Sequence, residues 1–212
     1  MNNKKTLYLW DLGDTLFIEK WNQEKTGFSS FNEWVEDKLG VDISGVSPRK
    51  YEEMYEIPYH QGWHFNLDIE PGFLEALALS EYNEAFTSGT PEQINWRAEY
   101  LQDIVGFDIR LYLQKVNSTF DFKETNIKDE DMYYSIFLNK VKEGHDTIVY
   151  SDDKIKYLEQ CYRAGERIKK EYPGFELRLY QMINKDVGLT RKEYYWEAGS
   201  LFDVVNNEKS FK

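Results

Sequence analysis

The feature that most constrains this chain is a short apolar run, residues 7–10, which leads directly into the acidic turn Asp11-Leu12-Gly13-Asp14. A run of Leu, Tyr, Leu and Trp without a polar interruption is typical of a strand that is buried on both faces of a parallel sheet. Asp11 would then stand at the carboxyl end of this strand. Ligands bind at that edge of open parallel sheets, because the loops that leave the strands line a common crevice.

A carboxylate at this position can attack phosphorus, hold a metal ion or only cap the turn. Taken locally, the turn interpretation is favoured, because Asp and Gly commonly follow a strand. The functional interpretations therefore depend on whether polar residues follow other strands of the chain.

A second buried strand pattern, residues 147–150, also leads into acids, Asp152 and Asp153, and a helical pattern of apolar residues follows them. Adjacent carboxylates repel each other unless a cation lies among them, so this strand end indicates a site for a divalent metal ion. The alternative is that the two acids only cap the helix, where the positive end of the helix dipole favours negative charge.

Hydroxyl residues and a glycine follow a third strand pattern, residues 84–86. The order Thr87-Ser88-Gly89-Thr90-Pro91 predicts a nest of backbone N–H groups suited to an anion, with Pro91 in the first turn of the next helix. The alternative is an ordinary helix N-cap formed by Thr90 before Pro91.

The stretch around Asp11 resembles the first motif of the haloacid dehalogenase (HAD) superfamily, a hydrophobic strand followed by Asp-x-Asp-Gly-Thr. Asp11, Thr15 and Leu16 match this motif. Gly13 stands where phosphatases of the superfamily carry their second Asp, and Asp14 stands where they carry Gly. Segments similar to the other three motifs follow in the order of the family.

The resemblance implies a hydrolase in which Asp11 attacks a phosphomonoester and forms an aspartyl-phosphate. In the second motif, Thr87 would contact the phosphoryl group, with Ser88 and Gly89 beside it. The third motif is a lysine just before a helix, whose ammonium neutralises the nucleophile and the phosphoryl oxygens, and Lys128 stands there. A single loop lysine is otherwise a solvated surface residue in most proteins.

Two details of this comparison concern the loop at residues 120–131. Asp129 follows Lys128 where the family often has Pro, and Lys123 is the second candidate for the lysine of the third motif.

The cofactor that the resemblance implies is Mg²⁺. Asp11, Asp152 and the backbone carbonyl of Gly13 would hold it, and Asp153 would bind it through water or would orient Lys128. Mg²⁺ suits a site that offers only oxygen ligands.

We expect an α/β fold, a doubly wound Rossmann-like parallel sheet formed by residues 1–17 and 69–212. Residues 18–68 resemble the small α-helical cap domain that the family inserts after its first motif, a lid over the active site. Without the resemblance, the favoured interpretation of this segment is a helical hairpin that packs on the sheet.

Within the cap segment, the helical spacing of apolar residues predicts an amphipathic helix that carries Phe28, Phe31, Trp34, Val35 and Leu39. Ser29 or Ser30 would cap this helix and Gly40 would end it. A second helical piece is expected to begin near Ser47. The segment shows no convincing strand pattern.

Composition excludes several classes of function. The net charge of −12 over 212 residues opposes binding to nucleic acid, which proteins grip through clustered Lys and Arg. Cys161 is the only cysteine, so neither an internal disulfide nor a cysteine-based metal site can form. Since no signal peptide or apolar run of membrane-spanning length is recognisable, we expect a cytoplasmic protein, monomer or homodimer, that acts on a small phosphorylated metabolite.

Gly13 leaves two other functions open. A carboxylate at this position would protonate the leaving group and activate water, which is typically worth a factor of about 10² to 10⁴. Branches of the family that cleave carbon–halogen or carbon–phosphorus bonds also lack that acid, so a dehalogenase-like or phosphonatase-like hydrolase is an alternative. Asp152 and Asp153 argue against the dehalogenase, which needs no metal. A catalytically weak member that binds a ligand or partner through its aromatic cap is an alternative of another class.

Overall fold

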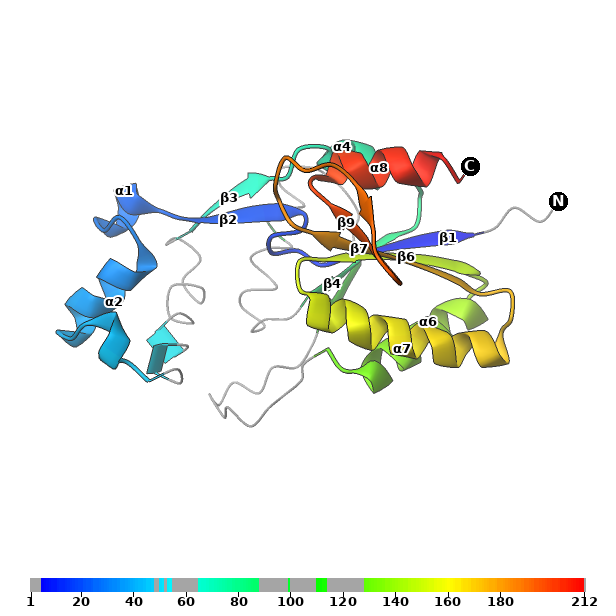
Figure 1. Cartoon of the computed structure of the whole chain (residues 1–212), viewed down its shortest axis with the longest axis horizontal. Helices are drawn as coiled ribbons and strands as arrows, with labels where there is room; N and C mark the ends of the chain where they lie inside the picture. Colours follow the sequence, from blue (N-terminus) through cyan, green and yellow to red (C-terminus); the bar gives the residue numbers. More distant parts are fainter. Residues whose placement is uncertain are drawn as a thin grey trace.

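The computed structural model describes residues 5–47, 50, 51, 53, 54, 65–87, 99, 110–113 and 128–211, and its main body is a seven-stranded sheet (Figure 1). In sheet order the strands are β5 (Arg110–Leu113), β4 (Asn83–Thr87), β1 (Thr6–Trp10), β6 (Thr147–Asp152), β7 (Glu176–Met182), β9 (Trp196–Ala198) and β8 (Thr190–Arg191). Each strand pair in this series is parallel except β9 with β8. The carboxyl ends of β4, β1 and β6 therefore meet at one edge of the sheet.

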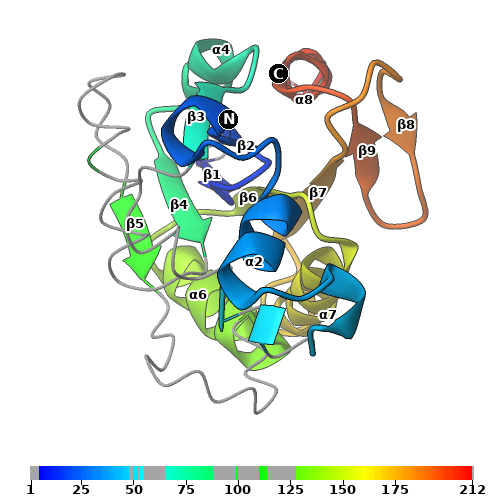
Figure 2. The same ribbon diagram turned by 90° about the vertical axis from the view of Figure 1, so that its left-hand side faces the viewer.

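Helices cover both faces of the sheet. Figure 2 shows α4 (Phe73–Leu77) and α8 (Leu201–Lys209) on one side, and α6 (Glu130–Lys142) and α7 (Ile155–Glu171) on the other. The expected α/β fold with a doubly wound, Rossmann-like parallel sheet is confirmed.

The alternation of side chains along β1 explains why that strand is apolar throughout. Leu7 and Leu9 belong to the core cluster that includes residues of α6 and α7, whereas Tyr8 and Trp10 belong to the cluster that includes residues of α4 and α8. Successive residues of a strand point to opposite faces, so a strand covered on both faces needs apolar residues at every position.

The segment between β1 and α4 extends away from the sheet. It contains β2 (Phe17–Trp21), α1 (Gln23–Thr26), α2 (Phe31–Leu39), the 3-10 turn η1 (Ile43–Gly45) and β3 (Phe65–Ile69). In Figure 1, α1 and α2 lie at the end of the molecule opposite the chain termini, and β2 and β3 connect this end with the sheet. Phe31, Trp34, Val35 and Met54 form an apolar cluster of their own there.

The expectation that residues 18–68 hold no strand is wrong, because β2 and β3 pair antiparallel from Phe17 opposite Ile69 to Trp21 opposite Phe65. The sequence of β2, Phe-Ile-Glu-Lys-Trp, lacks the strict alternation that predicts a strand. Its hydrogen-bond partner lies far along the chain, so a pattern search within one short segment cannot find the pairing.

The predicted helix is confirmed as α2, with Ser30, one of its two candidate caps, before it and Gly40 after it, while Phe28 lies outside it. The hydroxyl of Ser30 accepts a hydrogen bond from the backbone N–H of Glu33 across 3.2 Å. Gly40 ends the helix with a φ of +65°, a left-handed conformation that glycine adopts without steric cost.

No helix in the described part of the chain is both long and apolar enough to span a membrane.

Candidate active site

Two acids come together at the carboxyl edge of the sheet because their strands are neighbours. β1 pairs with β6 up to Trp10 opposite Ser151, and the backbone N–H of Asp11 continues this ladder by donating to the carbonyl of Ser151 across 2.9 Å. Asp152 is the last residue of β6. Asp11 is 7% exposed and Asp152 is 0% exposed, so both carboxylates are withdrawn from water.

Lys128 joins the two acids. It lies just before α6, its side chain is fully buried, and its ammonium donates to Asp11 Oδ1 across 2.7 Å and to Asp152 Oδ2 across 2.8 Å. Three aromatic rings have their centroids within 4.9–5.7 Å of Lys128 Nζ, namely Phe86, Tyr150 and Tyr157. The structure thus brings Asp11, Lys128 and Asp152 into one buried ionic cluster.

The charges in this cluster depend on each other. Burial alone would lower the pKa of Lys128, but the carboxylates of Asp11 and Asp152 outweigh burial and hold that pKa above its ordinary value. Burial raises the pKa of Asp11, although the Lys128 ammonium opposes this effect. A further cation near Asp11 would therefore favour its ionised, nucleophilic form.

Asp153 makes the cluster suitable for a metal ion. Asp11, Asp152 and Asp153 each offer one carboxylate oxygen, and these oxygens lie within 4.8 Å of one another. Asp153 Oδ1 is buried and has no hydrogen-bond partner among the described residues. A set of carboxylate oxygens with an unpartnered buried atom fits a hard divalent cation such as Mg²⁺.

Burial raises the pKa of Asp153 to about 7, and the nearby carboxylates of Asp152, Asp11 and Asp14 act in the same direction, against the opposing charge of Lys154. A bound divalent cation would offset this accumulation of negative charge.

Two tyrosines of the cluster were missed by sequence reasoning. The hydroxyl of Tyr150 donates to Asp152 and accepts a hydrogen bond from Lys128 across 3.0 Å, and the hydroxyls of Tyr133 and Tyr150 are 2.9 Å apart. In the sequence Tyr150 belongs to the apolar strand pattern of residues 147–150, and no motif includes Tyr133. The available signal was the spacing of Tyr150 and Asp152, since residues i and i+2 of a strand point to the same face.

Thr87 is the last residue of β4, next to β1, and is buried. It therefore lies at the same edge of the sheet as Asp11. Ser88, Gly89 and the second candidate lysine, Lys123, lie outside the described residues.

Gly13 and Asp14 form the turn that leaves β1. Asp14 is exposed and adopts a φ of +51°, in the left-handed region where glycine is favoured, and its carbonyl accepts a hydrogen bond from Asn184 Nδ2 across 2.8 Å. Gly13 forms an isolated bridge with Phe17. The turn thus has an acid at its left-handed position and no side chain at the preceding one.

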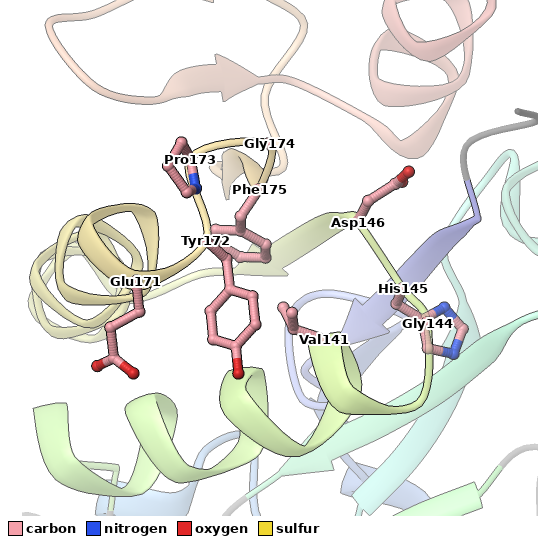
Figure 3. A pocket seen from close by; sticks show the side chains of 9 residues that line it. All are labelled: Val141, Gly144, His145, Asp146, Glu171, Tyr172, Pro173, Gly174 and Phe175. Atoms are coloured by element: carbon pink, nitrogen blue, oxygen red, sulfur yellow. The ribbon is translucent and has the colours of Figure 1, made fainter.

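A pocket of about 630 Å³ lies at the opposite edge of the sheet, where the loops lead into β6 and β7 (Figure 3). Val141 lines it from the end of α6, His145 and Asp146 line it from the first loop, and Tyr172 and Phe175 line it from the second. None of the clustered carboxylates borders it, so it is separate from the candidate active site.

One comparison with a solved structure supports the fold. No protein-family model and no curated protein matches this chain. The structure of a haloacid dehalogenase-like family hydrolase from Xanthomonas campestris is similar with a TM-score of 0.54 and 13% identity, over 98% of this chain and 96% of that chain. The structure of a second protein, described as a haloacid dehalogenase-like hydrolase from Burkholderia xenovorans LB400, gives a TM-score of 0.42 and 16% identity, over 99% of both chains.

Proposed function

Since this chain has the fold of the haloacid dehalogenase-like hydrolases, we propose that it is a Mg²⁺-dependent phosphatase that hydrolyses a small phosphomonoester through an aspartyl-phosphate. The observation that carries the proposal is the buried cluster of Asp11, Lys128 and Asp152 at the carboxyl edge of the sheet. Ligands bind at this edge in open parallel sheets.

Asp11 is the nucleophile in this proposal. One of its carboxylate oxygens forms a bond to phosphorus, while the bond between phosphorus and the oxygen of the leaving group breaks. Water then attacks the phosphorus of the aspartyl-phosphate, which releases inorganic phosphate and restores the carboxylate. Lys128, already 2.7 Å from Asp11 Oδ1, places a positive charge where negative charge accumulates on the phosphoryl oxygens.

The metal site consists of the Asp11 and Asp152 carboxylates and the backbone carbonyl of Gly13, with Asp153 acting through water or by orienting Lys128. Two observations support this assignment. Asp153 Oδ1 has no hydrogen-bond partner among the described residues, and the three carboxylates lie close together. A bound Mg²⁺ supplies charge neutralisation at the phosphoryl oxygens. The third ligand that the family resemblance implies is a backbone carbonyl, which every residue has. Gly13 is therefore compatible with metal binding.

The substrate is a small phosphorylated metabolite. Thr87, with Ser88 and Gly89, binds its phosphoryl group through hydroxyl and backbone N–H groups, and the buried position of Thr87 at the end of β4 supports this role. Residues 18–68 act as the cap that selects the rest of the substrate.

Gly13 favours a second candidate function, because a glycine side chain cannot protonate a leaving group. A dehalogenase-like or phosphonatase-like hydrolase would use the carboxylate of Asp11 to attack the substrate without an acid at position 13. The cluster of Asp152 and Asp153 with Asp11 favours the metal-dependent phosphatase over the dehalogenase.

The test is a hydrolysis assay with an aryl phosphate in the presence and absence of Mg²⁺, beside an assay with 2-haloacids without metal. We expect Mg²⁺-dependent release of phosphate that is lost in Asp11→Asn and kept in Asp146→Asn, a matched change at the opposite edge of the sheet. Metal-independent release of halide would instead support the dehalogenase, and the absence of both activities would contradict an enzymatic function on these substrates.

A further inference from the structure

We propose that Tyr150, supported by Tyr133, is a positioning residue that holds Lys128 and Asp152 in the arrangement required by the reaction. The inference rests on the proposed function, since it assigns a role within the same site. The family resemblance assigns no role to either tyrosine, although Tyr150 lies in the strand that ends at Asp152.

The hydroxyl of Tyr150 lies between the two groups that it would position. It is 3.0 Å from Lys128 Nζ and is also hydrogen-bonded to Asp152 Oδ2, which itself lies 2.8 Å from Lys128 Nζ. The three groups therefore form a closed triangle of hydrogen bonds. Tyr133, Tyr150 and Asp152 are each 0% exposed and Lys128 is 1% exposed, so bulk water does not compete for these contacts.

The chemistry of the four groups determines the direction of each hydrogen bond. A lysine ammonium only donates and an ionised carboxylate only accepts, so the hydroxyl of Tyr150 accepts from Lys128 and donates to Asp152. With its single proton used, Tyr150 can only accept from Tyr133. The donor in the 2.9 Å contact between the two hydroxyls is therefore Tyr133.

This assignment occupies every N–H of the Lys128 ammonium. Its three donors are directed to Asp11 Oδ1 at 2.7 Å, Asp152 Oδ2 at 2.8 Å and the Tyr150 hydroxyl at 3.0 Å. Three fixed acceptors define the position and the rotation of the ammonium, which two acceptors would leave less constrained. Tyr150 thus determines how Lys128 approaches the nucleophile, although no hydrogen bond among the described residues joins Tyr150 to Asp11.

Tyr150 also orients the carboxylate of Asp152, one of the proposed metal ligands. The backbone N–H of Lys154 donates to Asp152 Oδ1 across 2.9 Å, while Tyr150 and Lys128 donate to Oδ2. Donors on both oxygens fix the plane of the carboxylate. Groups that hold a metal ligand in this way typically change metal affinity or activity by about 10-fold to 100-fold when they are removed.

Tyr150→Phe removes one oxygen atom and retains the ring. We expect this variant to bind Mg²⁺ about 10-fold more weakly by calorimetry and to lose about 10-fold to 100-fold in kcat on an aryl phosphate, with a smaller change in KM. Tyr133→Phe retains both contacts of the Tyr150 hydroxyl, so we expect a smaller loss of kcat, about 2-fold to 10-fold, with unchanged folding.

Tyr8→Phe is the matched control. The Tyr8 hydroxyl also donates to a buried carboxylate, Glu208 Oε2 at 3.0 Å, on the opposite face of the sheet. We expect Tyr8→Phe to lower thermal stability while leaving Mg²⁺ affinity and kcat unchanged. If Tyr150→Phe behaves like Tyr8→Phe in both measurements, the tyrosine has a merely structural role and the inference is overturned.

A readout without substrate separates this inference from the proposed function. The Lys128 ammonium, buried with three acceptors, should give a slowly exchanging ¹H–¹⁵N signal by NMR, and Tyr150→Phe should accelerate its exchange more than Tyr8→Phe does. Accelerated exchange in a protein that hydrolyses no phosphomonoester would support the positioning of Lys128 and contradict the phosphatase. An unchanged signal, in an active enzyme, would contradict the positioning. If Tyr150→Phe does not fold, an unchanged kcat in Tyr133→Phe overturns the inference.

Discussion

The ammonium of Lys128 donates to Oδ1 of Asp11 across 2.7 Å, although 117 positions separate the two residues in the sequence. The same ammonium donates to Asp152, so one buried cation faces two buried acids, and the carboxylate of Asp153 lies close to both. Lys128 balances only part of this negative charge. A divalent cation at the cluster would stabilise the folded protein, because the unfolded chain does not assemble these ligands.

Millimolar Mg²⁺ should therefore raise the melting temperature. A concentration of about 100 times Kd adds about 2.7 kcal/mol to the free energy of unfolding, which corresponds to roughly 5–10 °C for a chain of this size. Asp152→Ala should abolish the shift, whereas Asp146→Asn, at the opposite edge of the sheet, should retain it. Equal Mg²⁺ binding by wild type and Asp152→Ala in calorimetry would contradict the ligand assignment.

The raised pKa of Asp153 predicts a pH-dependent effect of Asp153→Asn. With an unfolded pKa near 3.8 and a folded pKa of about 7, the folded state binds this proton more tightly, so the carboxyl destabilises the folded protein increasingly as the pH rises from about 4 to 7. Without metal, Asp153→Asn should thus stabilise the protein at pH 8, by up to about 4 kcal/mol, and have little effect near pH 4. Urea unfolding at both pH values measures this. A variant that is less stable than wild type at pH 8 would contradict the folded pKa.

The elements that local patterns define were predictable from the sequence. β1 and β6 contain continuous apolar runs that lead into acids, and such runs are typical of strands buried on both faces of a parallel sheet. The carboxyl ends of these strands lie at the same edge of the sheet, so the proximity of Asp11 and Asp152 could be anticipated. The caps of α2, Ser30 and Gly40, are equally local.

Contacts between distant segments were not predictable in the same way. The pairing of β2 with β3 depends on a partner strand far along the chain. The roles of Tyr133 and Tyr150 depend on which atom faces each hydroxyl, and a tyrosine in an apolar pattern does not reveal this. Lys128 was placed by family resemblance alone, because a loop lysine carries no local signal that it will be buried.

Residues 18–68 should respond to an occupied site if they form a cap. We expect hydrogen exchange in α2 to slow when Mg²⁺ and beryllofluoride, a mimic of the phosphoryl group, are added together, because lids that close over a site exclude water. Mg²⁺ alone is the control and should have a smaller effect. Unchanged exchange in α2, with protection at the ends of β1 and β6, would contradict the cap.

The absence of an acid at position 13 predicts a dependence on the leaving group. Aryl phosphates need little protonation of the leaving oxygen, so wild type should hydrolyse them much faster than alkyl phosphates. Changing Gly13 to Asp and Asp14 to Gly together should accelerate alkyl phosphate hydrolysis by about 10² to 10⁴. The second change also places glycine at a φ of +51°, a conformation that it adopts readily.

Asp14→Ala is the control for this prediction, since it tests whether Asp14 already supplies the proton. Rapid hydrolysis of alkyl phosphates by wild type that survives Asp14→Ala would contradict the leaving-group prediction, because the acid would then come from another residue.

In the proposed reaction Asp11 carries the phosphoryl group. The most direct test is to quench the enzyme during turnover of an aryl phosphate with Mg²⁺, reduce the acyl phosphate with borohydride, and locate the modified residue by peptide mass spectrometry. We expect modification of Asp11 alone, dependent on Mg²⁺ and absent from Asp11→Asn. Phosphate release by wild type with the label on another residue, or undiminished phosphate release by Asp11→Asn, would contradict it.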